Sequence, residues 1–307
     1  MSLQKNITSR NYSINLYKSI AMIDYTLRKI LVPTDFSEHA NHALSLAAEI
    51  AAETDAELTL LTVVNYPGGT ALHTTGAGRG DPAENKYMQE LTEKVQEKIK
   101  DLPDDINLGD INLKRKVQVG NPFTHISDEI TQNDTDLVIM GTKGTSGLDE
   151  VFIGSNTERV VRHAKCPVIS VKEKISLSQI DNIAFAVDPK IEDELFFSKV
   201  KQLQHLFKAN LHVVMINTPN HFLREIIAMK LLEDMATRNM FKDYKVYTFS
   251  DITEEEGIIY FADQINADLI AMGTQGRTGI AHLISGSIAE EVVNHAKRPV
   301  WTYRLSK

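Results

Sequence analysis

Two glycine-rich segments carry the residue types that bind phosphate groups. Each has the pattern G-x2-G-x9-G-S and directly follows an apolar run. Glycines let the backbone approach a ligand closely, and successive inward-facing N–H groups form a nest for an anion. A helix that begins at the serine adds unpaired N–H groups and a partial positive charge. The pattern therefore predicts two phosphate-binding loops, formed by Gly141, Gly144, Gly154 and Ser155 and by Gly273, Gly276, Gly286 and Ser287.

A purely structural interpretation also explains the serines. S-N-T-E from Ser155 to Glu158 and S-I-A-E from Ser287 to Glu290 have the form of capping boxes. In a capping box, the serine and glutamate side chains satisfy the free N–H groups at a helix start. Two complete copies of the glycine spacing, each after the same kind of apolar run, favour a phosphate site over a simple turn.

Other motifs give weaker support for chemistry. The chain has no G-x4-G-K-[ST] motif, so a P-loop site is excluded. His39 and His42 are three residues apart on a predicted helix, but no third metal ligand is evident beside them. GAGRGD at 76–81 lies in a loop rather than between a strand and a helix, so we do not interpret it as a dinucleotide fingerprint. Cys166 begins an apolar run, and we expect a small buried residue without an activating partner.

A long internal repeat identifies the elements that position these loops. DLVIMGTKGTSG at 136–147 matches DLIAMGTQGRTG at 268–279, an offset of 268 − 136 = 132. Near the start of each half, KILVPTD at 29–35 matches NIAFAVD at 182–188, an offset of 182 − 29 = 153. The difference, 153 − 132 = 21 residues, falls in the glycine-rich and polar stretch 66–85, which predicts a loop present only in the first half.

Each half alternates short apolar strands with amphipathic helices. Runs such as DLVIMG have no polar alternation, which is typical of strands buried on both faces of a parallel sheet. The sequence thus predicts an α/β fold of two tandem doubly wound domains, each a five-stranded, mainly parallel sheet with helices on both faces. The predicted strands lie at 29–34, 57–64, 113–119, 136–141 and 166–171, then at 182–187, 210–216, 244–250, 268–273 and 298–303.

The domain limits and the cellular setting follow from composition. We expect an extension at 1–26, a first domain at 27–173, a linker at 174–180 and a second domain at 181–307. A net charge of −8 gives no general attraction for nucleic acid or an anionic membrane. No apolar run reaches the roughly 18 residues that span a bilayer. With a single cysteine and no secretory signal, the expected location is the cytoplasm.

The combined pattern resembles the ATP-binding branch of the universal stress protein family. The resemblance rests on the two glycine loops and on P-T-D at Pro33, Thr34 and Asp35, and it covers about 29–172 and 182–304. It implies a Rossmann-like fold of the adenine-nucleotide-hydrolase-like group. It also implies ATP as the ligand, with or without Mg²⁺, and AMP or ADP as alternatives.

The resemblance also implies a set of site residues. In the family, the aspartate after the first strand faces the nucleoside, and a backbone position near the end of the second strand contacts adenine. The glycine loop and its serine hold ribose and phosphates. The implied first-half residues are Thr34, Asp35, Val63, Gly141, Thr142, Gly144, Gly154, Ser155 and Asn156. The implied second-half residues are Asp188, Met215, Gly273, Gly276, Gly286, Ser287 and Ile288.

The expected function is that of a regulatory ATP-binding protein in a stress or starvation response. ATP hydrolysis is expected to be slow or absent, because no nucleophile–base pair accompanies the loops. Two alternatives stay open: a nucleotide-hydrolysing enzyme of the same fold, and an interaction module that binds a lipid or a protein partner. Intact glycine loops in both halves favour a nucleotide site.

Two expectations concern the relation between the halves. Single-domain relatives commonly dimerise through their last strands, so 166–171 and 298–303 should pair within this chain as an internal pseudo-dimer. Further association into a homodimer stays open. The first half should bind nucleotide more tightly, because the second half has Val187 for Thr34, Met215 for Val63 and Ile252 for Gly120.

Overall fold

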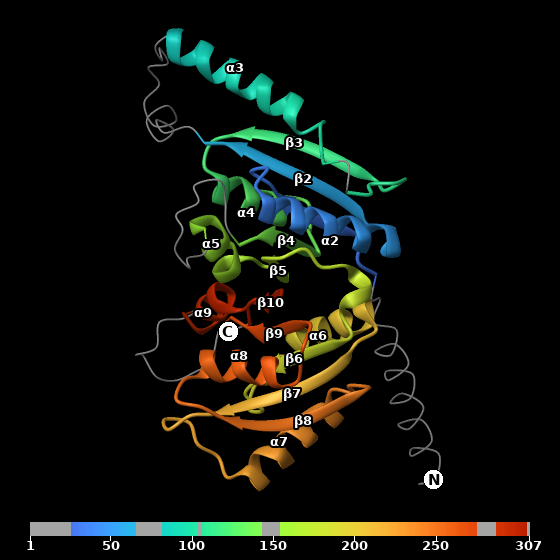
Figure 1. Ribbon diagram of the computed structural model, residues 1–307, viewed down its shortest axis with the longest axis vertical. Coiled ribbons are helices and arrows are strands. Elements are labelled where there is room, and N and C mark those ends of the chain that lie inside the picture. The colour runs from blue at the N-terminus through green and yellow to red at the C-terminus, as the bar shows by residue number, and fades with distance from the viewer. Residues whose placement is uncertain (1–25, 66–81, 104–105, 143–153, 275–286, 306–307) are drawn as a thin grey trace, which may run out of the picture.

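A computed structural model describes residues 26–65, 82–103, 106–142, 154–274 and 287–305 (Figure 1). The strands are β1 (Lys29–Pro33), β2 (Glu57–Val64), β3 (Leu113–Val119), β4 (Leu137–Gly141), β5 (Val168–Val171), β6 (Asn182–Ala186), β7 (Asn210–Asn217), β8 (Tyr244–Ser250), β9 (Leu269–Gly273) and β10 (Val300–Tyr303). The α-helices are α2 (Glu38–Thr54), α3 (Pro82–Lys98), α4 (Pro122–Gln132), α5 (Ser155–His163), α6 (Glu194–Phe207), α7 (Glu225–Arg238), α8 (Glu254–Gln264) and α9 (Ser287–His295). A short 3-10 helix, η1 (Leu177–Gln179), precedes β6.

The strands form one ten-stranded sheet in the order β3-β2-β1-β4-β5-β10-β9-β6-β7-β8. Within each half all neighbouring strands are parallel. The chain order reverses between β1 and β4, and again between β6 and β9. Each reversal is a topological switch point, where open α/β sheets bind ligands beyond the carboxyl ends of the strands. The predicted α/β class and order of elements are confirmed.

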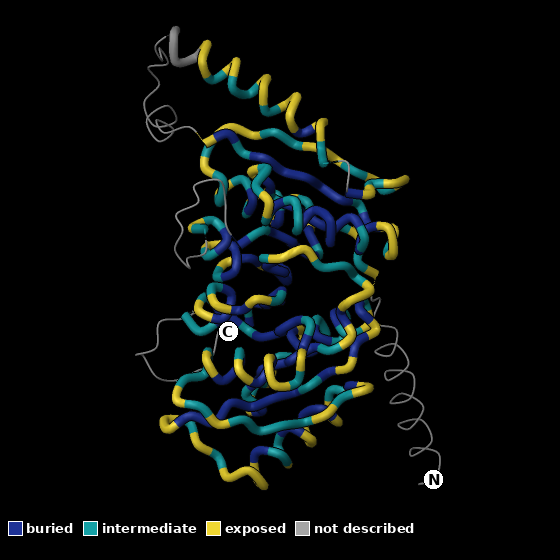
Figure 2. Tube along the Cα trace, viewed as in Figure 1, coloured by how far each residue is buried: buried dark blue, intermediate teal, exposed yellow. Residues whose placement is uncertain are grey.

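Helices cover both faces of the sheet. One core lies between the sheet and helices α2, α6 and α7, and the other lies between the sheet and helices α4, α5, α8 and α9. Each core continues through both halves. Figure 2 shows buried strands along the middle of the molecule and exposed residues along its outer turns. The two halves are therefore joined by continuous apolar packing.

Helix α2 shows how local sequence sets this packing. Ser37 caps the helix as predicted, since its side chain accepts a hydrogen bond from the Ala40 N–H at 3.3 Å. Ala40, Ala43 and Ala47 lie on the buried face. These small side chains let the helix axis approach the sheet closely, next to β1 and β4.

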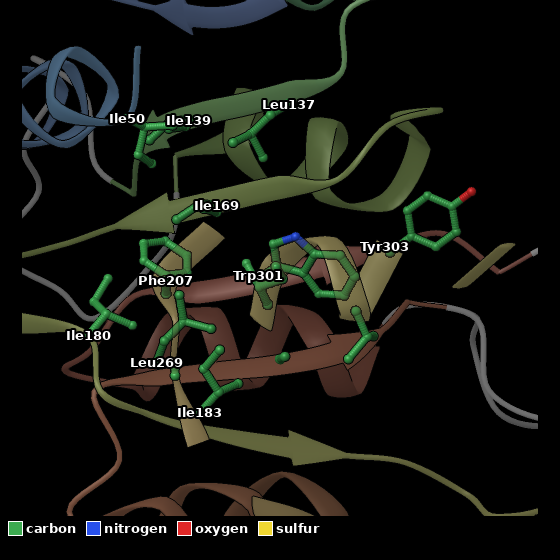
Figure 3. Packing of buried hydrophobic residues seen from close by; sticks show 14 of the residues in the cluster. Ile50, Leu137, Ile139, Ile169, Ile180, Ile183, Phe207, Leu269, Trp301 and Tyr303 are labelled. Atoms are coloured by element: carbon green, nitrogen blue, oxygen red, sulfur yellow. The ribbon is translucent and has the colours of Figure 1, made fainter. Parts of the chain in front are cut away.

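The two halves meet where β5 and β10 pair antiparallel, with Ile169 opposite Trp301. Because 301 − 169 = 132 is the offset of the repeat, these two residues are counterparts, and a pseudo-two-fold axis passes between them. Figure 3 shows both side chains in the apolar core with Phe207, Leu269 and Ile183. The predicted pairing of the final strands is confirmed, and neither strand is left as a sheet edge.

Polar contacts supplement this junction. Arg162 of α5 pairs with Glu290 of α9, with Nε and Oε1 2.6 Å apart. The Lys172 ammonium donates to the backbone oxygens of Asn294 at 2.9 Å and of Ala296 at 3.4 Å, at the carboxyl end of α9. Partly exposed ion pairs contribute at most about 1 kcal/mol each. The sheet and the two cores therefore supply most of the stability of the junction.

Candidate functional site

The first-half site is built around the switch point between β1 and β4. Gly141 is the last residue of β4, and Ser155 is the first residue of α5. The Gly154 N–H donates to the Thr142 oxygen at 2.8 Å, so the chain returns beside the point where it left the sheet. Thr157 ties the helix to the strand, because its hydroxyl donates to the Gly141 oxygen at 2.9 Å. Gly144 lies outside the described residues.

Thr34 and Asp35 form a tight turn between β1 and α2. The Thr34 hydroxyl accepts the Phe36 N–H at 3.0 Å, and the Asp35 carboxylate accepts the Ser37 N–H at 3.0 Å. Phe36 has a positive φ of 64°, which turns the chain sharply into the helix. Thr34 is buried and Asp35 is exposed. The turn therefore holds the Asp35 carboxylate in place at the mouth of the switch point.

Gly141 has a packing role of its own. A β-carbon built at this position would lie 2.7 Å from the His39 carbonyl carbon and 2.8 Å from the Ala40 nitrogen. Any larger residue would push the amino end of α2 away from β4. At the equivalent Gly273, the atoms nearest to a β-carbon would be those of the Leu305 side chain, at 3.1 Å. Gly141 thus fixes the relative position of the two elements that flank the site.

The start of α5 differs from the predicted capping box. Its N-cap is Gly154, which makes no side-chain capping bond, and Ser155 lies one position inside the helix. The capping-box prediction for Ser155 is therefore wrong, because the capping geometry requires the serine at the N-cap itself. Helices α2, α4, α6 and α8 are each capped by a side chain. Among the described residues, no side chain caps the amino end of α5, and the same holds for α7.

Thr142 and Thr274 occupy the same place in the two halves and share an unusual property. Both side chains are buried, with 3% and 4% exposure, and neither hydroxyl has a hydrogen-bond partner among the described residues. A buried polar group without a partner costs about 1–3 kcal/mol. Each backbone N–H is bonded to the next strand, at Val171 and at Tyr303 respectively. Each half therefore places, at the first residue after its strand, a buried hydroxyl without a partner in the part of the chain that the structure describes.

The second-half residues lie at the corresponding switch point between β6 and β9. Asp188 repeats the turn of Asp35, since its carboxylate accepts the Lys190 N–H at 3.0 Å. Ser287 begins α9, and Ile288 packs against the core on the α8 and α9 face. Asn156 of the first half is the counterpart of Ile288 and is half-buried on α5. Gly276 and Gly286 lie outside the described residues.

Strand register corrects the pairing of Val63 with Met215. The residues that follow β1 and β6 donate to the oxygens of Leu61 and Val214, and 214 − 61 = 153. The counterpart of Val63 is therefore Ile216. Met215 is 4% exposed and lies in the core on the α6 and α7 face. Since successive strand residues point to opposite faces, a shift of one residue takes the Met215 side chain away from the predicted adenine position.

The pairing of Gly120 with Ile252 is corrected in the same way. The Gly120 N–H donates to the Val64 oxygen at 2.9 Å, and the Asp251 N–H donates to the Asn217 oxygen at 3.0 Å. Asp251 is thus the counterpart of Gly120. Ile252 is an additional residue whose side chain is 78% exposed. Met215 and Ile252 are therefore not the counterparts of Val63 and Gly120.

A different feature distinguishes the second half, and the sequence interpretation missed it. Glu254 begins α8, and its carboxylate lies 3.6 Å from the His221 ring. Burial raises the pKa of Glu254, and the charges of Asp188 and Glu255 raise it further. The first turn of α8 carries three glutamates, whereas the first turn of α4, fully described, carries no acidic residue. In the sequence, the run of three glutamates at 254–256 indicates this concentration of negative charge.

The remaining candidate groups do not add chemistry. Cys166 is buried, and burial raises the pKa of its thiol to about 12, so the predicted inert cysteine is confirmed. Within the described ranges, no three His, Cys, Asp or Glu side chains cluster as metal ligands would. No described helix combines the length and apolar character needed to cross a bilayer.

Comparison with known proteins gives one consistent result. The model of the universal stress protein family matches the chain twice, at residues 26–172 and 179–304. A universal stress protein of Methanocaldococcus jannaschii is 32% identical over 149 residues, which cover 48% of this chain and 82% of that protein. A universal stress protein of Synechocystis is 23% identical over 291 residues, which cover 91% of this chain and 100% of its own length.

Solved structures extend the similarity to the complete tandem arrangement. The crystal structure of a universal stress protein from Archaeoglobus fulgidus superposes with a TM-score of 0.68 at 21% identity. The superposition covers 90% of this chain and 98% of that one. At this level of identity the likeness concerns the fold.

Proposed function

The chain belongs to the universal stress protein family, and on that premise we propose that it binds ATP at the first-half switch point and acts as a regulatory protein. The observation that supports this most directly is the start of α5, which no described side chain caps, beside the Thr142 hydroxyl, which has no hydrogen-bond partner among the described residues. Both groups are polar, both lie at the carboxyl end of β4, and both gain hydrogen bonds if an anion binds there.

The phosphates of ATP would bind at the amino end of α5. The N–H groups of Ser155 and Asn156 and the helix dipole favour negative charge there, by about 0.3–1 kcal/mol for the dipole. The Thr142 hydroxyl would donate to a phosphate oxygen and lose its desolvation penalty. Gly154 leaves room for this approach because it has no side chain.

The nucleoside would lie toward β1 and β2. The Asp35 carboxylate, held by its turn, is an acceptor for ribose hydroxyl donors. Val63 is half-buried near the end of β2, where its backbone would contact adenine. AMP and ADP would use the same nucleoside contacts with fewer phosphate contacts. Mg²⁺ would accompany the phosphates, as it commonly does when few protein ligands are available.

The second half would bind nucleotide more weakly. At the phosphate end, it keeps a buried Thr274 hydroxyl that, like that of Thr142, has no hydrogen-bond partner among the described residues. Near the nucleoside end, burial raises the pKa of the Glu254 carboxyl, and the negative charge of Asp188 raises it further. Excess negative charge near a triphosphate lowers its affinity by Coulomb repulsion.

We propose that the protein hydrolyses ATP slowly and that its role in the cell is regulatory. The described residues of the site supply hydrogen-bond donors and an acceptor, but no paired nucleophile and base. Binding without rapid turnover suits a protein that reports nucleotide status in a stress or starvation response. The single, inert cysteine is consistent with the cytoplasm as the place of action.

The test is direct. The purified protein is heat-denatured, and the supernatant is analysed by mass spectrometry for co-purified nucleotide, followed by calorimetry with ATP, ADP and AMP. We expect ATP or a close relative in the supernatant and measurable ATP affinity. Absence of both would sink the proposal, and a lipid or a protein in place of nucleotide would establish the interaction-module alternative. Rapid ATP turnover would instead establish the enzyme.

A further inference from the structure

A groove of about 350 Å³ lies between the two halves of the molecule. The first half contributes residues from the end of α2 and from the amino ends of β1, β4 and β5, and the second half contributes residues of α6 and β10. The proposed nucleotide site lies at the carboxyl ends of β1 and β4, so it does not account for this groove. Small-molecule sites have volumes of about 300–1,000 Å³ and often lie between domains. The groove therefore has the size and the position of a site for a small ligand.

The floor of the groove is apolar. Leu137, Leu203 and Trp301 line it and belong to the buried core on the α2 and α6 face. Figure 3 shows Leu137 and Trp301 within this core. Leu27 and Leu206 also line the groove and pack against the same core, partly buried. A ligand with an apolar body is stabilised here, because contact with this floor removes apolar surface from water.

The two carboxylates that line the groove already have partners. The Glu53 carboxylate lies 3.0 Å from the Lys208 ammonium. Asp136 accepts the backbone N–H groups of residues 28 and 29, both at 3.0 Å. The Thr54 hydroxyl is also used, since it donates to the Ile50 oxygen at 2.7 Å. These groups are occupied by contacts within the chain, so they do not favour a cationic ligand.

Two hydrogen-bond donors of the groove are not used in this way. Lys199 and Gln202 both line the groove and are half-buried. They are three residues apart on α6 and therefore lie on the same face of the helix. Neither side chain has a hydrogen bond or an ion pair with another residue in the described part of the chain. Burial raises the pKa of Cys166, and the nearby charge of Lys199 opposes this effect, which places the lysine close to the start of β5.

The internal repeat shows that these donors are particular to the second half. The counterpart of Lys199 on α2 is Leu46, since 199 − 46 = 153, and Leu46 is fully buried. The counterpart of Gln202 is Glu49, since 202 − 49 = 153, and its carboxylate accepts the Leu177 N–H at 2.7 Å. A charged group that is partly removed from water is stabilised by an opposite charge. The chain thus places an ammonium group in an apolar groove without supplying its anion.

We infer that this groove binds a small organic acid. Its carboxylate accepts hydrogen bonds from the Lys199 ammonium and from the Gln202 side-chain amide, and its apolar body lies against Trp301. Charge-assisted hydrogen bonds of this kind are about twice as strong as neutral ones. The ligand is therefore selected by one negative charge next to an apolar chain or ring. This inference is independent of nucleotide binding.

Titration of the full chain with octanoate tests the inference. Trp301 is the only tryptophan of the chain and lines the groove, so its fluorescence reports on the bound ligand. We expect a saturable change of this fluorescence and the same affinity by calorimetry. The uncharged 1-octanol has the same chain without the carboxylate, and it should bind at least about tenfold more weakly, because it lacks the charge-assisted bonds. Equal affinities for the two compounds, or no saturable binding by either method, would overturn the inference.

A pair of lysine variants locates the binding site. Lys199→Met keeps the length of the side chain but removes the ammonium, and it should weaken octanoate binding at least about tenfold. Lys230→Met is the matched control, because Lys230 is exposed on α7 and does not line the groove, and its affinity should equal that of the wild type. Circular dichroism confirms that both variants are folded. An unchanged affinity in the folded Lys199 variant would contradict the assignment.

Competition with ATP separates the groove from the nucleotide site. Octanoate binding should be unchanged in the presence of ATP, because the groove lies at the opposite ends of β1 and β4. Displacement of octanoate by ATP would place octanoate at the switch point and overturn the inference. If the chain binds no ATP but binds octanoate through Lys199, the nucleotide proposal fails and the groove assignment stands.

Discussion

Ile169 and Trp301, counterparts in the internal repeat, lie directly opposite each other across β5 and β10. The pair places a large aromatic side chain against a smaller aliphatic one at the pseudo-two-fold axis. Trp301 is 1% exposed, and its ring stacks with those of Phe196 and Tyr303 at centroid distances of 6.2 Å each. The centre of the sheet is therefore packed asymmetrically, with aromatic residues drawn from the second half.

This packing predicts that the two halves unfold together. Trp301→Ala should lower the free energy of unfolding by about 3–5 kcal/mol, because it leaves a cavity in the shared core. Ile169→Val, the milder control, should cost about 0.5–1.5 kcal/mol. Urea unfolding followed by far-UV circular dichroism measures both, since the Trp301 variant lacks a fluorescence signal. Two separate transitions, with only one shifted, would show that the halves are independent.

Replacement of Thr142 by valine should affect folding and binding in opposite directions. The hydroxyl has no partner among the described residues, so its removal should leave the free energy of unfolding unchanged or raise it by about 1 kcal/mol. ATP affinity should fall several-fold, equivalent to about 1 kcal/mol. Thr157→Val is the matched control, because its hydroxyl donates to Gly141 and its loss should lower stability. An unchanged ATP affinity in Thr142→Val would remove the phosphate role of this residue.

The two nucleotide sites should differ in affinity. Gly154→Val blocks the approach to the first site, and Gly286→Val is the corresponding change in the second glycine loop. Because Glu254 and Asp188 add negative charge to the second site, the Gly154 change should cause the larger loss of ATP binding by calorimetry. The double variant should bind no ATP. A larger loss from Gly286→Val would reverse the ranking.

Stability should depend on the protonation of Glu254. Burial raises its pKa in the folded protein, so the folded state favours the protonated form. The stability that this proton contributes is fully present below the ordinary glutamate pKa and is lost as the pH rises through the raised value. Glu254→Gln should therefore flatten the pH dependence of thermal unfolding above the ordinary glutamate pKa. Glu256→Gln, exposed on the same helix turn, is the control and should retain the wild-type slope.

The strands and their order were predictable because their apolar runs are long, repeated and bounded by turn residues. The antiparallel pairing of β5 and β10 was also predictable, since two adjacent halves can cover their last edges only by pairing them. In contrast, the match of Val63 with Met215 was wrong by one residue. Apolar runs at 57–64 and 210–216 align almost equally well at either offset, and only the ladder of backbone hydrogen bonds decides between them.

Helix starts and local charge were the other limits of prediction. Ser155 satisfies the capping-box pattern in sequence, but the helix begins at the serine itself, a difference of one residue that composition does not encode. The raised pKa of Glu254 comes first from its burial and then from the charge of Asp188, 66 residues earlier in the chain, since 254 − 188 = 66. The sequence does not show that Glu254, at the start of α8, lies near Asp188, which follows β6. Only the folded structure brings these two residues together.

The junction of β5 with β10 lies within one polypeptide, and this has an evolutionary consequence. In a dimer of separate identical chains, every substitution at the axis appears twice, and dilution separates the partners. Here covalent linkage fixes the effective concentration of each half for the other, and dilution cannot part them. Each half is then free to accumulate its own substitutions, as Pro122 and Glu254 at the starts of α4 and α8 illustrate. Tandem fusion thus permits one site to retain an ancestral ligand while the other diverges.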